Sequence, residues 1–238
     1  MSIELIKRLS LDNEIAKNIL VIGVFHGDEE QGEALVNRYL GRCADGACAI
    51  CGFKDNLNDF CSLGKVITEP FKKGNLKNNL YYIPRLNSAK TRVNRNGVDL
   101  NRNFPTKNWG ENTSAAGDNA ADYYGGRAAA SEEETKFIVS LMEQIKFDAI
   151  LTIHSPYKIV NYDGDNDGEA LKLAQKISEF TGYPVQKDIG YPTPGSFGTY
   201  AGVERDIPVI TVEVDENELY SVLYPKFKKV FEYLENDY

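Results

Sequence analysis

The chain has 238 residues, of which 42% are hydrophobic and 26% charged, and its formal net charge at neutral pH is −8. This length allows one α/β domain with a sizeable core or, as the less favoured alternative, two small ones, and the composition is ordinary for a soluble globular protein. The acidic balance disfavours nucleic acid as a partner, because phosphate binding needs a basic face.

The N-terminal part of the chain predicts a strand that ends beside a histidine. Residues 1–8 lack the apolar core of a signal peptide, and no apolar run approaches about 18 residues, so we expect a cytoplasmic protein without membrane spans. The first strand is predicted over 18–25, and its apolar character indicates a central place in a sheet. A helix that ends at Gly41 should follow His26 at once, with Glu29 in its first turn.

The segment from Gly41 to Asn79 is polar and contains glycine, and we interpret it as an excursion within a single domain that spans 1–238. It holds all four cysteines of the chain, Cys43, Cys48, Cys51 and Cys61. Disulfides are not expected in a reducing cytoplasm. These thiols could bind a second, structural zinc ion around the Cys48-x-x-Cys51 pair, or they could be unpaired.

The rest of the chain alternates strands with helices. Strands are predicted over 80–84, 149–153 and 208–214, and helices over 131–145, 169–180 and 216–234. Ser131 to Glu134 has the pattern of a capping box, and Pro225 should kink or split the last helix. The segment 85–127, between the strand over 80–84 and the helix that begins at 131, is long and irregular, which is typical of a functional loop. The alternation predicts an α/β fold with a mixed or largely parallel sheet flanked by helices.

The chain has only two histidines, and both follow predicted strands. His26 has Glu29 three residues after it, and His154 ends the run from Ala149. Imidazole and carboxylate are zinc ligands, and three protein ligands leave the fourth position open, as in catalytic sites. We therefore predict one Zn²⁺ per chain at His26, Glu29 and His154. The alternative is two histidines satisfied beside a core.

Two other features carry possible chemistry. The segment 91–105 is dense in arginine and asparagine. Such side chains could be merely solvated, but guanidinium groups bind a carboxylate through two parallel hydrogen bonds, which suits recognition of an anion. Glu213 stands inside the apolar run 209–214. Burying a carboxylate is costly unless it has a partner, and this favours a site over packing.

These residues together resemble the zinc carboxypeptidase family. The run from Gly97 to Phe104, GVDLNRNF, is similar to the family's substrate-carboxylate motif, and His26 with Glu29 is similar to its H-x-x-E. His154 matches the third metal ligand and Glu213 the catalytic glutamate, in the same order along the chain. Within the family the likeness is closest to the bacterial murein peptide amidases, in Arg92, Asn94 and Asn96 and in the run GYPTPGSFG over 190–198.

The resemblance implies a role for each matched residue. It implies that zinc is bound by His26, Glu29 and His154, and that the substrate carboxylate is held by Asn101 and Arg102. It implies that Arg92 stabilises the oxyanion, with Arg95 as a less favoured substitute, and that Tyr191 closes over the substrate. Glu213 would be the general base and then the general acid, and Asp99 would accept a hydrogen bond from the His26 ring. Tyr191 could instead be an aromatic loop anchor, and Asp99 a turn residue.

The implied function is a zinc amidase that cleaves the γ-D-glutamyl–meso-diaminopimelate bond of murein tripeptide in cell-wall recycling. The chemistry is consistent, because zinc acidifies water and polarises an amide, an arginine stabilises the oxyanion, and a glutamate transfers the proton. Three alternatives stay open: a deacylase like aspartoacylase or succinylglutamate desuccinylase, a general carboxypeptidase, and a metal- or ligand-binding protein without turnover. The run 190–198 favours the amidase over the deacylase, and Arg92 with Glu213 argues against a protein without turnover.

Overall fold

The computed structural model describes residues 3–10, 16–42, 64–68, 76–110, 120–164, 168–187 and 189–238. The strands are β1 (Ile3–Arg8), β2 (Asn18–Ile22), β3 (Gly64–Thr68), β4 (Asn79–Ile83), β5 (Ala149–His154), β6 (Ile159–Asp163), β7 (Val185–Gln186) and β8 (Val209–Glu213). The helices are α1 (Gln31–Tyr39), α2 (Glu133–Gln144), α3 (Glu169–Thr181) and α4 (Tyr220–Asn236), with the short helices η1 (Leu100–Arg102), η2 (Ala120–Tyr123) and η3 (Gly198–Val203).

The eight strands form one mixed sheet in the order β3-β1-β4-β2-β5-β8-β6-β7. The central strands β4, β2, β5 and β8 are parallel to one another. Antiparallel pairs lie on either side, β1 with β4 and β6 with β8. The predicted α/β fold with a mixed sheet is therefore confirmed.

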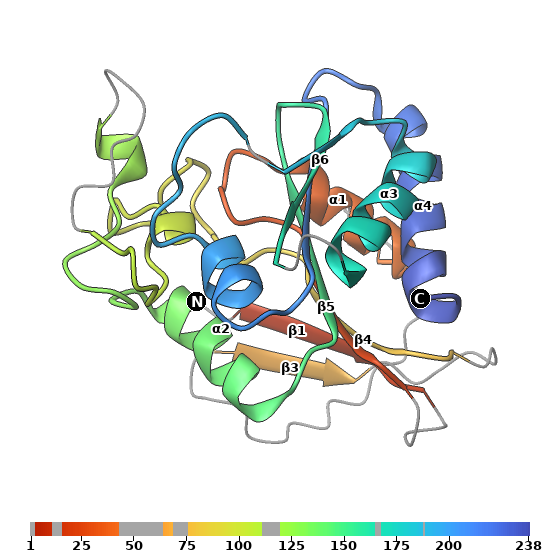
Figure 1. Cartoon of the computed structure of the whole chain (residues 1–238), viewed down its shortest axis with the longest axis horizontal. Helices are drawn as coiled ribbons and strands as arrows, with labels where there is room; N and C mark the ends of the chain where they lie inside the picture. Colours follow the sequence, from red (N-terminus) through yellow and green to blue (C-terminus); the bar gives the residue numbers. More distant parts are fainter. Residues whose placement is uncertain are drawn as a thin grey trace.

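Helices cover both faces of the sheet (Figure 1). Alternate residues of a strand point to opposite faces, so Ile19 and Val21 pack with α1, α3 and α4, whereas Leu20 and Ile22 pack with α2 and η3. The result is a three-layer arrangement with two apolar cores. Among the helices that the structure describes, none has both the length and the apolar composition of a membrane span.

The strand predicted over 18–25, which is β2, and the helix after it, α1, are both shorter than predicted. β2 ends at Ile22 rather than Phe25, because the chain leaves the ladder there. Phe25 is still fully buried, against Phe104 and Phe197 of two later loops, so its apolar character reflects loop packing rather than strand pairing. α1 begins at Gln31, and Glu29 lies in the turn before the helix instead of in its first turn.

The predicted N-termini of two other helices, α2 and α4, were also wrong. α2 has Glu132 as its N-cap and no side-chain capping bond, because Ser131 donates its hydroxyl to the Glu132 carboxylate instead. α4 begins at Tyr220, four residues later than predicted, and continues through Pro225 as one helix. Pro225 is in the second turn, where it removes only the bond to the carbonyl four residues before it.

Four strands, β1, β3, β6 and β7, were not predicted, and each lies towards a side of the sheet. β1 pairs with β3 and β4, β6 pairs with β7 and β8, and β7 has only two residues. β3 lies inside the segment predicted as an excursion and extends the sheet beside β1. The four cysteines, and with them the possible second zinc ion, lie outside the described residues.

Candidate active site

The candidate site lies where the central parallel strands end. β2, β5 and β8 are neighbours, and the carboxyl ends of parallel strands meet at one edge of a sheet, which is where ligands bind in such folds. His154 ends β5 and Glu213 ends β8, and the two are direct partners across the strands. His26 follows the end of β2.

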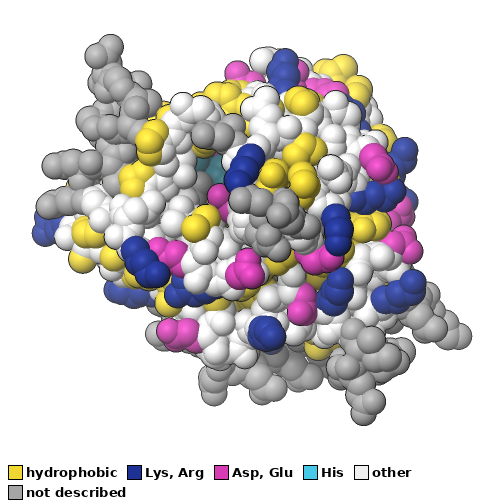
Figure 2. Space-filling model, viewed as in Figure 1, with side chains coloured by type: hydrophobic (Ala, Val, Ile, Leu, Met, Phe, Trp, Pro, Cys, Tyr) yellow, Lys and Arg dark blue, Asp and Glu magenta, His cyan; other side chains and the backbone are white. Residues whose placement is uncertain are grey.

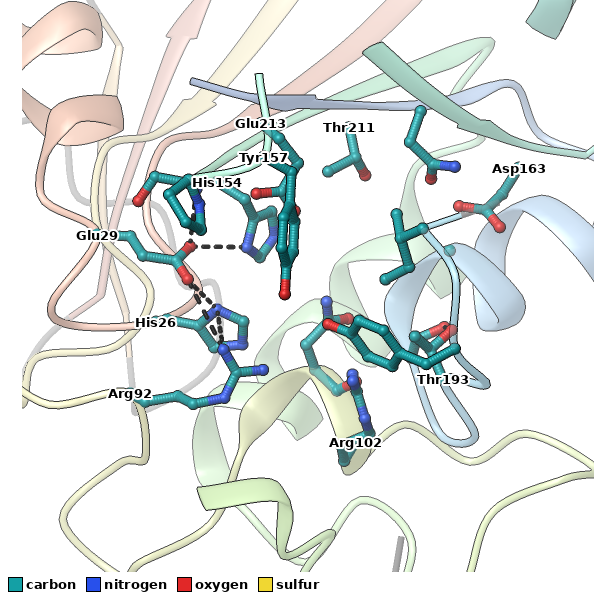
Figure 3. Close-up of a pocket in the computed structure, with 18 of the residues that line it drawn as sticks. His26, Glu29, Arg92, Arg102, His154, Tyr157, Asp163, Thr193, Thr211 and Glu213 are labelled. Atoms are coloured by element: carbon teal, nitrogen blue, oxygen red, sulfur yellow. Dashed lines mark hydrogen bonds and ion pairs between the residues drawn. The ribbon is translucent and has the colours of Figure 1, made fainter. Parts of the chain in front are cut away.

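Two glycines bring α1 close to the end of β2. A Cβ atom on Gly32 would lie 1.7 Å from the carbonyl oxygen of Gly23, so any larger residue would push the helix from the strand. Glu29 lies in the short turn between them, and its backbone N–H donates to the carbonyl of His26 at 3.1 Å. This local packing brings the Glu29 carboxylate to both histidines (Figure 3).

His26, Glu29 and His154 form a compact cluster. Nδ1 of His26 lies 2.7 Å from Oε1 of Glu29, and Nδ1 of His154 lies 2.9 Å from Oε2 of the same carboxylate. One ligand atom from each residue lies within 4.8 Å of the other two. Both histidines are buried and only 4% exposed. Two nitrogens and one oxygen that converge in this way fit a zinc ion with an open fourth position.

Asp99 joins this cluster to the arginine loop. Its Oδ1 lies 3.1 Å from Nε2 of His26 and accepts the backbone N–H of Asn101 at 2.8 Å. Its Oδ2 accepts from Nη2 of Arg92 at 3.0 Å. A carboxylate on the outer nitrogen of an imidazole fixes the ring orientation and leaves Nδ1 for a metal.

The charges of the cluster favour a cation. Burial alone lowers the pKa of His26, but the carboxylates of Glu29 and Asp99 outweigh it and raise the pKa to about 9. Burial alone would raise the pKa of Glu29 and of Asp99, yet the neighbouring imidazoles, and for Asp99 also Arg92 and Arg102, hold both well below their usual range. Positive charge is therefore stabilised here, as a divalent metal ion requires.

Arg102 lies beside this cluster, almost entirely buried. Its Nη1 donates to the carbonyl of Asn101 at 2.7 Å, and its guanidinium lies 5.6 Å from the centre of the Tyr123 ring. Its Nε is buried without a hydrogen-bond partner among the described residues. Asn101 accepts the backbone N–H of Phe197 at 2.8 Å, which fastens the run 97–104 to the run 190–198.

Glu213 offers the second buried atom without a partner. Its side chain is 7% exposed, and its Oε2 makes no hydrogen bond among the described residues. Burial raises the pKa of the Glu213 carboxyl, an effect that His154 partly offsets and Glu29 reinforces. A buried polar atom without a partner costs about 1–3 kcal/mol, so its presence beside a cavity indicates that a ligand completes it.

One cavity of about 480 Å³ contacts these groups. Its lining includes the predicted residues His26, Glu29, Arg92, Asn101, Arg102, His154, Tyr191 and Glu213. Burial and the neighbouring Tyr157 raise the pKa of Tyr191. Arg95 is exposed and does not line this cavity. In Figure 2 a histidine is visible at the bottom of a hollow in the surface.

A model of the zinc carboxypeptidase family matches residues 82–226 of the chain. The chain belongs to the zinc carboxypeptidase family. This confirms the family resemblance that the sequence motifs predicted.

Murein peptide amidase A of Vibrio campbellii is 34% identical to this family member over 137 residues, which are 55% of this chain and 53% of the relative. The same-named protein of Escherichia coli K12 is 32% identical over 128 residues, 51% and 50% of the two chains. The matched part thus spans about half the length of the curated relatives.

Solved structures share the fold of the family. The murein-tripeptide amidase of Escherichia coli O157 superposes with a TM-score of 0.67 at 21% identity and covers 96% of this chain and 85% of its own. Thrombin-activatable fibrinolysis inhibitor superposes with a TM-score of 0.65 at 18% identity, over 96% and 63% of the two chains.

Sequence reasoning missed part of the cavity wall of this family member. Asn161 and Asp163 of β6, Thr211 of β8 and Tyr157 also line the cavity. The alternation of apolar and polar residues over 159–163 is a strand signal that could have revealed Asn161 and Asp163. Which strand lies next to β8 cannot be read from that alternation.

Proposed function

We propose that this protein is a zinc-dependent amidase that hydrolyses the γ-D-glutamyl–meso-diaminopimelate bond of murein tripeptide. The observation that carries the proposal is one cavity that joins a three-ligand cluster, two arginines and a glutamate whose Oε2 has no hydrogen-bond partner among the described residues. Cytoplasmic location and a role in cell-wall recycling are part of the same proposal.

Arg102 and Asn101 are proposed to hold the α-carboxylate of the leaving diaminopimelate. Arg102 lines the cavity, its Nε has no hydrogen-bond partner among the described residues, and guanidinium–carboxylate pairs are charge-assisted. Arg92 is proposed to stabilise the oxyanion. Its Nη1 lies 3.8 Å from Oε1 of Glu29, close to the candidate metal ligands, and a positive group next to a developing oxyanion lowers the barrier.

Glu213 is proposed to move the proton. When bound by His26, Glu29 and His154, zinc supplies Lewis acidity towards the amide carbonyl and water. Glu213 accepts a proton from the attacking water and passes it to the leaving nitrogen, so that the amide C–N bond breaks and a carboxylate and an amine result. The upward shift in the pKa of Glu213 helps the carboxyl to hold that proton between the two transfers.

The substrate assignment is supported by the relatives and by two motifs. Two curated relatives at 34% and 32% identity are named murein peptide amidase A. The run 190–198 packs on the run 97–104, since Phe104 donates its backbone N–H to Gly195 at 2.9 Å. Both motifs that resemble the amidases therefore meet at the cavity.

Mass spectrometry of products tests the substrate. The zinc-loaded protein should release diaminopimelate from L-Ala-γ-D-Glu-meso-diaminopimelate and leave N-acetylaspartate and N-succinylglutamate intact. An ordinary peptide with a C-terminal leucine should react far more slowly. Turnover of the acylated amino acids without turnover of the tripeptide would replace the proposal with a deacylase.

Metal analysis tests the ligands. About one zinc per chain is expected in the parent, and His154→Ala should lose it, because two remaining ligands hold zinc poorly. Full zinc content in His154→Ala would contradict this ligand set. Any further zinc that disappears on replacing Cys48 and Cys51 would identify a separate cysteine site.

A further inference from the structure

The cavity has a second end, away from the candidate metal ligands. β6 runs antiparallel to β8, and the partners across the two strands are Ile159 with Glu213, Asn161 with Thr211, and Asp163 with Val209. Partners in adjacent strands share a face, so Asn161, Thr211 and Asp163 continue the wall that begins at Glu213. Figure 3 shows Asp163 on the side of the cavity opposite Glu29.

The carboxylate of Asp163 is not paired with a cation among the residues that the structure describes. Within the described part of the chain, neither a hydrogen bond nor an ion pair reaches it, although it lines the cavity. Burial alone raises the pKa of Asp163 to about 6, and no positive group offsets this effect. Lys187 also lines the cavity, but it is exposed and does not pair with Asp163.

A glycine makes room for this carboxylate. A Cβ atom on Gly198, at the start of η3, would lie 2.1 Å from Oδ2 of Asp163. The carboxylate can therefore lie against the backbone of η3 only because residue 198 has no side chain. Gly198 itself lines the cavity, so the acidic group and the glycine form one part of its wall.

We propose that Asp163 determines the specificity of this cavity by binding an ammonium group at the end of the leaving residue's side chain. The inference rests on the proposed function, since it assumes that the leaving residue binds between Arg102 and Glu213. A side-chain ammonium offsets the cost of burying the unpaired carboxylate. An acidic side chain is repelled, and an apolar one leaves the carboxylate without a partner.

The position of Asp163 also sets the length of the side chain. Asp163 is four residues along β6 from Ile159, the partner of Glu213, which is about 13 Å of strand. A long side chain is needed to approach Asp163 from the scissile bond. Lysine-like side chains, including that of diaminopimelate with its distal amine, combine length with a terminal ammonium.

Two matched substrates test the inference. L-Ala-γ-D-Glu-L-Lys carries the terminal ammonium, and L-Ala-γ-D-Glu-L-norleucine lacks it. The zinc-loaded parent should prefer the lysine substrate in kcat/KM. Asp163→Asn should reduce this preference by roughly 10- to 100-fold, the usual worth of a hydrogen bond to a charged group. Asp237→Asn, an exposed aspartate outside the cavity, should keep the preference of the parent.

A binding measurement separates this inference from the proposed function. Calorimetry should find that free L-lysine binds the zinc-loaded parent more tightly than L-norleucine, and that Asp163→Asn abolishes the difference. Asp163→Asn should not lower the Tm, because it removes an unpaired buried charge. Retention of both lysine preferences in Asp163→Asn would overturn the role of Asp163. If the parent turns over neither of these tripeptides nor the diaminopimelate tripeptide, but binds lysine through Asp163, the amidase proposal fails and the ammonium site stands.

Discussion

Two buried clusters of charged and aromatic side chains lie at opposite edges of the sheet. The first is the candidate site, at the carboxyl ends of β2, β5 and β8. The second lies where α1 and α4 end, and there Glu235 accepts from Tyr39 at 2.6 Å, from Tyr82 at 3.2 Å and from Arg8. Both clusters bury carboxylates next to positive or polar groups.

The difference between the clusters is whether the partners are complete. Both carboxylate oxygens of Glu235 are occupied by groups of the chain itself. In the candidate site, Oε2 of Glu213 and Nε of Arg102 are buried and have no hydrogen-bond partner within the described part of the chain, and both residues line the cavity. Burial of charge alone therefore does not distinguish a site from a structural cluster, whereas incomplete hydrogen bonding beside a cavity does.

Replacing Glu213 should have the largest effect on activity. Glu213→Gln keeps the shape of the side chain but cannot accept a proton, so kcat should fall by roughly 10²- to 10⁴-fold. Zinc content, substrate affinity and Tm should stay close to those of the parent, because Oε2 has no partner to lose. Steady-state kinetics and metal analysis check this. Turnover within a few-fold of the parent would remove Glu213 from the mechanism. Its buried carboxylate would then be structural, like that of Glu235.

Replacing Glu235 should have the opposite outcome. Glu235→Leu removes the carboxylate that pairs with Arg8 and accepts from two tyrosine hydroxyls, and breaking a buried ion pair costs about 3 kcal/mol of unfolding free energy. Zinc content and kcat/KM should not change, since none of the residues of this cluster lines the cavity. Denaturant unfolding measures the loss. Glu232→Leu on the same helix is the control, because its pair with Lys228 is exposed and contributes little.

Arg102→Lys should weaken substrate binding, with a smaller effect on activity than Glu213→Gln. An ammonium cannot reproduce the guanidinium fork, so KM for the tripeptide should rise roughly 10-fold or more with a smaller change in kcat. Arg95→Lys should leave both constants as they are, because Arg95 is exposed and does not line the cavity. Equal constants for Arg102→Lys and the parent would show that the carboxylate binds elsewhere.

The pH dependence of stability should be the most modest effect. In the metal-free protein the pKa of His26 is about 9, above the ~6.5 of an unfolded chain. Protonated His26 therefore stabilises the fold fully below about pH 6.5, and this stabilisation is lost as the pH rises to about 9. With zinc the direction reverses, because ligation needs neutral imidazole.

Thermal unfolding from pH 6 to 9.5, with a chelator and with zinc, measures both slopes. His26→Gln should lack the falling slope in chelator. A metal-free Tm that rises over this range would contradict the predicted interaction of His26 with Glu29 and Asp99.

Local patterns in the sequence were sufficient for much of this molecule. The apolar runs before His26 and His154 predicted strands, and the run GVDLNRNF predicted the arginine and asparagine that line the cavity. Such patterns are local, because strand periodicity, turn residues and short motifs involve neighbours along the chain. The ends of the elements were predicted less accurately. Phe25 is apolar because it packs against distant loops, not because it belongs to the strand. The hydroxyl of Ser131 donates to Glu132 instead of capping the helix.

The sequence by itself determined the family, the α/β fold and the set of residues that carry the candidate chemistry. Only the tertiary structure decided which atoms meet: Nδ1 of both histidines on one carboxylate, Asp99 on the far side of the His26 ring, and Asp163 in the wall that begins at Glu213. The reason is that strand order and register join segments far apart in the chain. In this mixed sheet β6 lies beside β8, and no local pattern in the sequence specifies β8 as its neighbour.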